Sequence, residues 1–133
     1  AFDAVLTAVE TGKADIVIAM EPMEALRYKH ALAPDGWIVT ASTPLINIPN
    51  YPELETILAE LKTFGNLNLI DAEGLAKENK MPRSVNMILL GAAAKALDLD
   101  IETLSESVAR VFGSKGEAVV EMNVNALKIG AGV

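Results

Sequence analysis

The sequence predicts an α/β fold, a three-layer Rossmann-like parallel sheet flanked by helices. An unbroken apolar run, Ile16–Met20, is followed directly by Glu21-Pro22 and then by a helical pattern. An apolar run of this kind is typical of a parallel strand covered on both faces, and proline is well suited to the first position of a helix. Two further short strand patterns follow, separated by a helical one. This strand–helix–strand order with short links predicts right-handed crossovers and parallel pairing.

The first half of the chain supplies the predicted strands. A strong turn signal, Pro34-Asp35-Gly36, separates the first helix from the second strand. The segment Thr43–Pro52 holds three prolines, so it cannot pair regularly in a sheet and should lie extended. The expected strands are Asp15–Met20, Trp37–Ala41 and Leu67–Ile70, and the expected helices are a short helix or turn at Val5–Thr11 and a helix at Pro22–Leu32. A further helix should begin at Pro52 and end at Gly65. Its apolar face consists of Leu54, Ile57, Leu58 and Leu61.

The second half is predicted to be helical. The expected helices are Ala72–Asn79 capped by Asp71, Val85–Leu97 capped by Ser84, Ile101–Phe112 capped by Asp100 and ended by Gly113, and Glu117–Ile129. Leu104, Val108 and Val111 should face inward. The five methionines, Met20, Met23, Met81, Met87 and Met122, should fill the core.

The helix expected at Val85–Ala94 is apolar almost all round and therefore needs neighbours on every side. Three short strands offer too little surface to cover so much apolar helix. We therefore expect further strands, either from residues preceding Ala1 or from a partner chain. The expectation is one domain over residues 1–133 that is incomplete at its N-terminus.

Composition excludes several classes of protein. The chain has 133 residues, a formal net charge of −7, one histidine and no cysteine. Nucleic-acid phosphates require clustered Lys and Arg, which an acidic chain of this kind does not offer. Without cysteine the chain has no disulfide, no thiol nucleophile and no thiolate ligand for an iron–sulfur cluster, and a single histidine argues against zinc. The longest apolar stretch, Met87–Ala94, is far shorter than the roughly 18 residues that span a bilayer. We expect a cytoplasmic protein with no membrane or nucleic-acid partner.

Six collinear stretches resemble one family. The stretches are Gly12–Val17, Glu21–Tyr28, Asp35–Thr40, Asn47–Pro52, Asn86–Ala92 and Phe112–Glu117, with Asn123 and Ala126 following. Together they are similar to the gamma-type domain of 2-oxoacid:ferredoxin oxidoreductases, in particular to the small (beta) subunits of the indolepyruvate branch. The resemblance covers essentially the whole chain in the family's order. The family's glycine-rich Gly-x-Gly-Gly-Gln-Gly loop and its Arg-Gly-Gly element, which come first, are not present; such a loop would bind an anion at a helix N-terminus.

The resemblance implies an enzyme that converts an aryl pyruvate such as indolepyruvate, with coenzyme A and oxidised ferredoxin, to the aryl-acetyl-CoA, CO2 and reduced ferredoxin. Thiamine diphosphate with magnesium and 4Fe-4S clusters supply the chemistry. Because this chain has neither cysteine nor a Gly-Asp-Gly signature, the resemblance places these cofactors on a larger alpha subunit. The chain would be a necessary partner of that subunit, inactive alone, with ferredoxin reached through the complex.

No residue is expected to be catalytic or to bind metal, and five are candidates for contact with the coenzyme. Glu21 follows the first strand, at the edge where ligands gather in open α/β sheets, although the helix macrodipole alone would favour a carboxylate there. Ser42 and Thr43 end the second strand, where the simpler interpretation is a cap or a turn. Arg83 could meet a coenzyme A phosphate or be a solvated loop charge.

Asn86 interrupts an apolar helix near its start, where a buried amide would need a hydrogen-bond partner from a neighbouring loop. Thr43–Pro52, with its prolines and apolar side chains, is also typical of a subunit interface.

Three alternatives remain open from the residues. The chain could be the gamma subunit of an enzyme acting on pyruvate or another 2-oxoacid, because the architecture is shared. It could be a free-standing coenzyme- or nucleotide-binding module. It could also be a heterodimerisation domain without any ligand, since fold alone does not choose among these.

Overall fold

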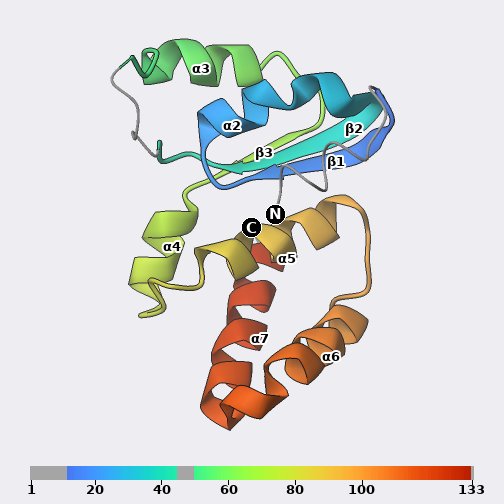
Figure 1. Ribbon diagram of the computed structural model, residues 1–133, viewed down its shortest axis with the longest axis vertical. Helices are drawn as coiled ribbons and strands as arrows, with labels where there is room; N and C mark the ends of the chain where they lie inside the picture. Colours follow the sequence, from blue (N-terminus) through green and yellow to red (C-terminus); the bar gives the residue numbers. More distant parts are fainter. Residues whose placement is uncertain (1–11, 45–49, 133) are drawn as a thin grey trace. The chain divides into compact units, whose positions relative to one another are not determined.

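A computed structural model describes residues 12–44 and 50–132 of the chain (Figure 1). The helix or turn predicted at Val5–Thr11 lies outside these residues. The chain divides into two compact units, which we call the sheet unit (residues 1–69) and the helical unit (residues 70–133). No helix within the described residues is both long and apolar enough to cross a membrane.

The sheet unit contains a three-stranded parallel sheet in the order β1-β2-β3, which confirms the predicted α/β class. The strands are β1 (Ala14–Ala19), β2 (Leu32–Ala41) and β3 (Leu67–Ile70), the last of which ends on the first residue of the helical unit. Central β2 pairs with β1 through the register Val17↔Ile38 and Ala19↔Thr40. On its other side, the Ile38 N–H donates to the Asn66 carbonyl at 2.9 Å.

The predicted turn at Pro34–Gly36 lies inside β2, so the prediction of a shorter strand from Trp37 was wrong. Ala14 pairs with Leu32, but Ile16 pairs with Trp37, which leaves a bulge of residues 33–36 in β2. The turn residues therefore form an irregularity within the strand rather than its boundary, as proline and glycine do at bulges. The Asn66 side chain holds the bulge by donating to the Asp35 carbonyl at 2.9 Å.

Two helices, α2 (Pro22–Arg27) and α3 (Leu54–Leu61), cover one face of this sheet (Figure 1). The core between them consists of Ala19, Ala25, Ile38, Ile57 and Leu61. Pro22 begins its helix as predicted, but the helix ends earlier than the predicted Leu32. Tyr28 leaves the helical conformation, and a separate 3-10 turn, η1 (Lys29–Ala31), leads into β2.

Strand β1 is not covered evenly on its two faces. Val17 and Ala19, on the face of α2 and α3, are 4% and 7% exposed, whereas Ile18 and Met20 are 37% and 44% exposed. The prediction of a strand covered on both faces was therefore wrong for these two side chains. The physical reason is that α2 and α3 pack on the face of Val17 and Ala19, whereas Ile18 and Met20 point to the opposite side of the strand.

The helical unit contains four helices and one 3-10 turn, within the residues described. They are α4 (Ala72–Glu78), α5 (Val85–Ala96), α6 (Ile101–Phe112), η2 (Gly113–Lys115) and α7 (Glu117–Ala131). Asp71 and Asp100 cap their helices as predicted, accepting from the Gly74 N–H at 3.0 Å and the Glu102 N–H at 3.1 Å. Ser84 occupies the N-cap position of α5, but its side chain makes no capping hydrogen bond.

Helices α5 and α7 cross at two glycines. A Cβ atom on Gly91 of α5 would overlap with the Leu127 carbonyl oxygen of α7, and one on Gly130 of α7 would overlap with the Ile88 carbonyl oxygen of α5. Each helix therefore contributes a glycine where the backbone of the other approaches most closely. The buried residues Ile88, Leu89, Ala92, Ala126 and Leu127 fill the remainder of this contact.

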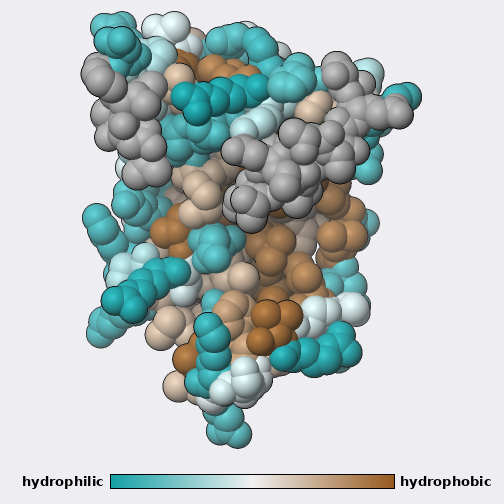
Figure 2. Space-filling model, viewed as in Figure 1, coloured by the Kyte–Doolittle hydropathy of each residue, from teal (hydrophilic) through white to brown (hydrophobic). Residues whose placement is uncertain are grey.

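Two apolar side chains of the helical unit are exposed although we predicted them to be inside. Val111 is 70% and Met122 is 45% exposed, whereas Val108, one turn before Val111, is only 5% exposed. Val111 lies in the last turn of α6, just before η2 turns the chain toward α7. On the face drawn in Figure 2, hydrophobic residues reach the surface among hydrophilic ones.

Candidate functional site

The carboxyl ends of β1 and β2 meet at one edge of the sheet, and three of the five candidate residues lie there. The last pair in the ladder is Ala19↔Thr40, so Glu21 and Ser42 each follow two residues beyond it. Thr43 comes next along the chain. Because ligands of open α/β sheets bind outside the carboxyl ends of the strands, we take this edge as the candidate site.

Glu21 is a buried carboxylate with a structural role. It is 4% exposed and occupies the N-cap position of α2, where its extended backbone precedes Pro22. Its Oε1 atom accepts a hydrogen bond from the Glu24 backbone N–H at 2.6 Å. This bond satisfies one of the amides that a helix leaves unpaired in its first turn. The interpretation of Glu21 as a helix-terminal carboxylate is thereby supported by geometry.

The second carboxylate oxygen of Glu21 binds a residue far along the chain. The Tyr51 hydroxyl donates to Oε2 at 2.6 Å, across 30 positions of sequence. Tyr51 lies between β2 and α3, just before α3 begins, and its ring packs against the core cluster of the sheet unit. The bond therefore fixes the end of the β2–α3 connection to the turn between β1 and α2.

The environment of Tyr51 changes its acidity. Partial burial, the hydrogen bond to Glu21 and the negative charge of Glu21 raise the pKa of Tyr51 from 10.0 to about 12. Each of these causes favours the neutral phenol over the phenolate. The hydroxyl is consequently a stable donor to the carboxylate throughout the physiological pH range.

Sequence reasoning counted Tyr51 only among apolar side chains and missed this contact. A buried tyrosine hydroxyl normally finds a partner, which was the available signal. The partner itself could not be read from the sequence, because the two residues are 30 positions apart.

Ser42 and Thr43 are the accessible polar groups of this edge. Ser42 is partly buried and Thr43 is exposed. Neither side chain makes a hydrogen bond to the residues that the structure describes. Their hydroxyl groups are therefore available to a ligand or to a partner chain. The rest of the predicted interface segment includes residues 45–49, which lie outside the described residues.

The remaining candidates, Arg83 and Asn86, belong to the helical unit. Arg83 is exposed and makes no ion pair with any residue in the described ranges. Asn86 is also exposed, in the first turn of α5, and its Oδ1 atom accepts from the Met87 N–H at 2.9 Å. The expected hydrogen bond from Asn86 to a neighbouring loop was wrong, because the side chain is exposed and bonds instead to the next residue of its own helix.

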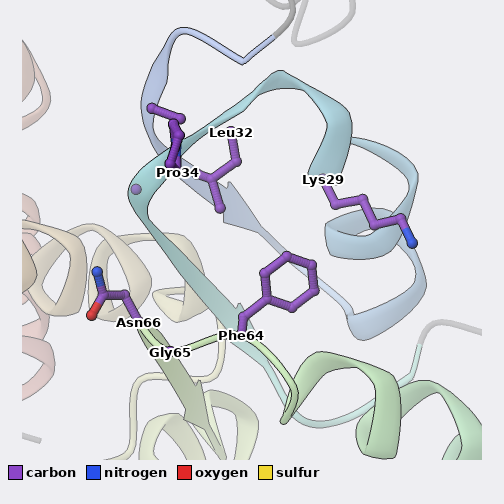
Figure 3. A pocket seen from close by; sticks show the side chains of 8 residues that line it. Lys29, Leu32, Pro34, Phe64, Gly65 and Asn66 are labelled. Carbon is purple, nitrogen blue, oxygen red and sulfur yellow. The ribbon is translucent and has the colours of Figure 1, made fainter.

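A cavity of about 240 Å³ lies at the opposite, amino-terminal edge of the sheet unit (Figure 3). Its walls are the bulge of β2 and the segment before β3. The ring of Phe64 and the side chain of Leu32 line it (Figure 3). The Lys29 ammonium group turns away from it (Figure 3) and pairs with Glu60 at 2.8 Å. The cavity therefore offers apolar surface and backbone but no unpaired charge.

The described residues offer no ligand set for a metal ion. Within the described residues no group of three His, Asp or Glu side chains is placed to hold a metal ion. The sequence has no cysteine to hold an iron–sulfur cluster. Thiolate ligands for such a cluster would therefore have to come from outside these 133 residues.

Comparison with known proteins identifies the family. Residues 2–133 match the pyruvate ferredoxin/flavodoxin oxidoreductase family, and the chain belongs to it. Among curated relatives, the chain is similar to proteins named "Indolepyruvate oxidoreductase subunit IorB". It is 31% identical to that of Pyrococcus horikoshii and 30% identical to that of Thermococcus kodakarensis. The protein of Archaeoglobus fulgidus is 28% identical. Each match covers 92% of this chain and 64% of the relative, so the chain spans less than two thirds of these proteins.

Proposed function

We propose that this chain acts as a subunit, or as part of a subunit, of an enzyme that oxidatively decarboxylates 2-oxoacids with ferredoxin as electron acceptor. The observation that carries this proposal is the match of nearly the whole chain to the pyruvate ferredoxin/flavodoxin oxidoreductase family. In the overall reaction a 2-oxoacid and coenzyme A give an acyl-CoA and CO2. The two electrons released reduce two one-electron ferredoxins, and one proton is set free.

Within such an enzyme the chain is a non-catalytic partner. We infer that a thiamine-diphosphate-binding alpha subunit holds the 4Fe-4S clusters, because this chain has no cysteine. The same subunit would hold the diphosphate with its magnesium, because this chain has no Gly-Asp-Gly signature. Thiamine diphosphate, when bound there, supplies the stabilised carbanion that decarboxylation requires. The present chain contributes the carboxyl edge of its sheet, where the Ser42 and Thr43 hydroxyl groups make no hydrogen bond to the described residues, and it works in the cytoplasm with ferredoxin.

We propose that the carboxyl edge of the sheet unit contacts coenzyme A. Ser42 and Thr43 offer hydroxyl donors, and Glu21 shapes the turn beside them. Arg83 and Asn86, in the helical unit, are exposed polar groups that suit a phosphate or an adenine, and they are separate candidates for contact with the coenzyme. These roles are separable, because the two groups of residues lie in different units.

An aryl pyruvate, with indolepyruvate as the reference compound, is the proposed substrate class. The support is the name that the relatives carry, at 28–31% identity. We propose that the alpha subunit selects the substrate. Pyruvate, 2-oxoglutarate and branched-chain oxoacids are the alternatives to compare.

The test is reconstitution. The full-length protein and its candidate alpha subunit are purified separately and together, and the reduction of ferredoxin is followed with each oxoacid. We expect coenzyme-dependent reduction with indolepyruvate by the complex only. Higher kcat/KM with pyruvate would move the protein to that branch of the family. Activity of this protein alone, or failure to form a complex, would overturn the subunit proposal, and tight nucleotide binding by the isolated chain would support a free-standing module instead.

A further inference from the structure

We propose that the Tyr51–Glu21 hydrogen bond determines which ligand charge the carboxyl edge accepts: it keeps the Glu21 carboxylate turned inward, so that an anionic ligand can approach Ser42 and Thr43. Tyr51 is in this sense a positioning residue that acts through Glu21. The inference rests on the proposed function, which makes the ligand coenzyme A, a polyanion.

Both oxygens of the carboxylate are engaged on the inner side. Oε1 accepts from the Glu24 N–H and Oε2 accepts from the Tyr51 hydroxyl, each at 2.6 Å. The residue is 4% exposed. A carboxylate that accepts two short, charge-assisted hydrogen bonds is held in one orientation. It therefore does not present an oxygen to the outside of the edge.

The donor is held independently of the acceptor. The ring of Tyr51 packs against the apolar cluster beneath α2 and α3, and only its hydroxyl reaches the carboxylate. Phenylalanine would preserve the packing and remove the donor alone. The raised pKa of Tyr51 agrees with this placement, since the neighbouring negative charge disfavours loss of the hydroxyl proton.

Loss of the hydroxyl would leave a buried carboxylate with one donor fewer. A buried charge without its partners is strongly disfavoured. The side chain would then rotate toward water, and Ser42 and Thr43 are polar groups accessible at the same edge. A negative charge at that edge would repel the phosphates of coenzyme A, and the repulsion would be weakened by salt.

The experiment is a mutant cycle in the reconstituted complex. Tyr51→Phe should raise the KM for coenzyme A by about 3- to 10-fold with kcat changed less than about twofold, as expected when ground-state binding is lost. Tyr51→Phe/Glu21→Gln should restore most of the wild-type KM, because the freed side chain no longer carries charge. Tyr28→Phe is the matched control, since it removes the other tyrosine hydroxyl of the chain and should leave the KM unchanged.

The outcomes separate the inference from the function on which it rests. A wild-type complex without coenzyme-dependent activity overturns both. With an active wild-type complex, an unchanged KM in Tyr51→Phe overturns the inference alone. If the KM is raised in Tyr51→Phe and the added Glu21→Gln does not lower it, the hydroxyl acts only on structure and the proposal is contradicted. The same conclusion follows if added salt does not reduce the raised KM.

A spectroscopic control tests the contact itself in the isolated chain. In a Tyr28→Phe background Tyr51 is the remaining tyrosine, so tyrosinate absorbance reports its ionisation directly. We expect a pKa of about 12 that falls toward 10.0 when Glu21→Gln is added. Identical titration curves for the two proteins would show that the hydrogen bond does not form and would refute the proposal without any partner subunit.

Discussion

Different kinds of contact stabilise the interior of the sheet unit and the interior of the helical unit. In the sheet unit, polar side chains join segments that are far apart in sequence: Tyr51 binds Glu21, Asn66 binds the Asp35 carbonyl and Lys29 pairs with Glu60. In the helical unit, the hydrogen bonds of Asp71, Asp100 and Asn123 span at most four positions. There, helices α5 and α7 approach each other through the backbone at the glycine crossing.

The difference indicates where each unit tolerates change. A polar contact between side chains can lose one partner and keep the backbone in place, at a modest cost in stability. A backbone-to-backbone approach has no side chain that can move aside. The helical unit should therefore be the more sensitive to a single added methyl group, and the sheet unit to changes of charge and hydrogen bonding.

The largest expected effect comes from the glycine crossing. Gly91→Ala and Gly130→Ala should each lower the free energy of unfolding by about 3 kcal/mol, because the new methyl group overlaps with a carbonyl oxygen of the facing helix. Urea unfolding followed by circular dichroism measures this. Gly113→Ala is the control, since Gly113 has a φ of −56° and no atom near the added methyl. It should stabilise the chain by about 0.5 kcal/mol. Wild-type stability in both Gly91→Ala and Gly130→Ala would refute the close crossing.

The next effect concerns Glu21. Glu21→Ala removes the cap of α2 and the acceptor of Tyr51, so we expect a loss of about 2 kcal/mol in unfolding free energy. Glu24→Ala removes only an exposed ion pair with Arg27 and should cost far less. An equal loss in the two variants would contradict the buried role of Glu21.

The same contact gives a pH dependence. The pKa of Tyr51 is raised in the folded chain, so folding favours the protonated phenol. This contribution is fully present below pH 10.0 and is lost as the pH rises toward about 12. Relative to wild type, Tyr51→Phe should therefore be least stable below pH 10.0, with the difference shrinking above it. Unfolding free energies measured across this range check the sign, and a difference that grows with pH would contradict it.

Local sequence pattern was sufficient for most elements and for two helix caps. Strand Leu67–Ile70 and the first residues of α2 and α4 were predicted as observed, because proline, aspartate and apolar periodicity act over one turn. The break at Tyr28 and the bulge after Leu32 were not predicted. Both depend on how β2 pairs with its neighbours, which the local pattern does not contain.

The sequence predicted where in the fold the candidate residues lie but not which side chains they contact. The order of the strands placed Glu21 and Ser42 at one edge, as the register shows. The Tyr51 hydroxyl bond and the exposure of Asn86 needed the folded chain, since a helical pattern does not say which polar residue of the first turn faces outward. Similarly, periodicity assigned Val111 to the core although the turn into η2 leaves it exposed.

A smaller effect of the opposite sign is expected in the helical unit. The Ser105 hydroxyl oxygen of α6 is buried and has no hydrogen-bond partner in the described part of the chain. Ser105→Ala removes an unsatisfied polar group and improves helix propensity, so it should raise stability by about 1 kcal/mol. Ser107→Ala is the matched control in the same helix. Its hydroxyl is hydrogen-bonded to the Thr103 carbonyl at 3.3 Å, and its loss should change stability by less than about 0.5 kcal/mol. Destabilisation by Ser105→Ala would show that the hydroxyl has a partner.

The smallest effect belongs to the ion pair of the sheet unit. Lys29 and Glu60 approach to 2.8 Å, but their side chains are 46% and 49% exposed. Water screens such a pair, so a double-mutant cycle of Lys29→Ala and Glu60→Ala should give a coupling of about 0.5 kcal/mol or less that disappears at high salt. A coupling above about 1 kcal/mol that resists salt would mean that the pair is shielded from water. The Lys29–Glu60 pair and the Glu21–Tyr51 hydrogen bond would then be comparable in strength. In that case the greater burial of Glu21 would not make its hydrogen bond the stronger of the two contacts.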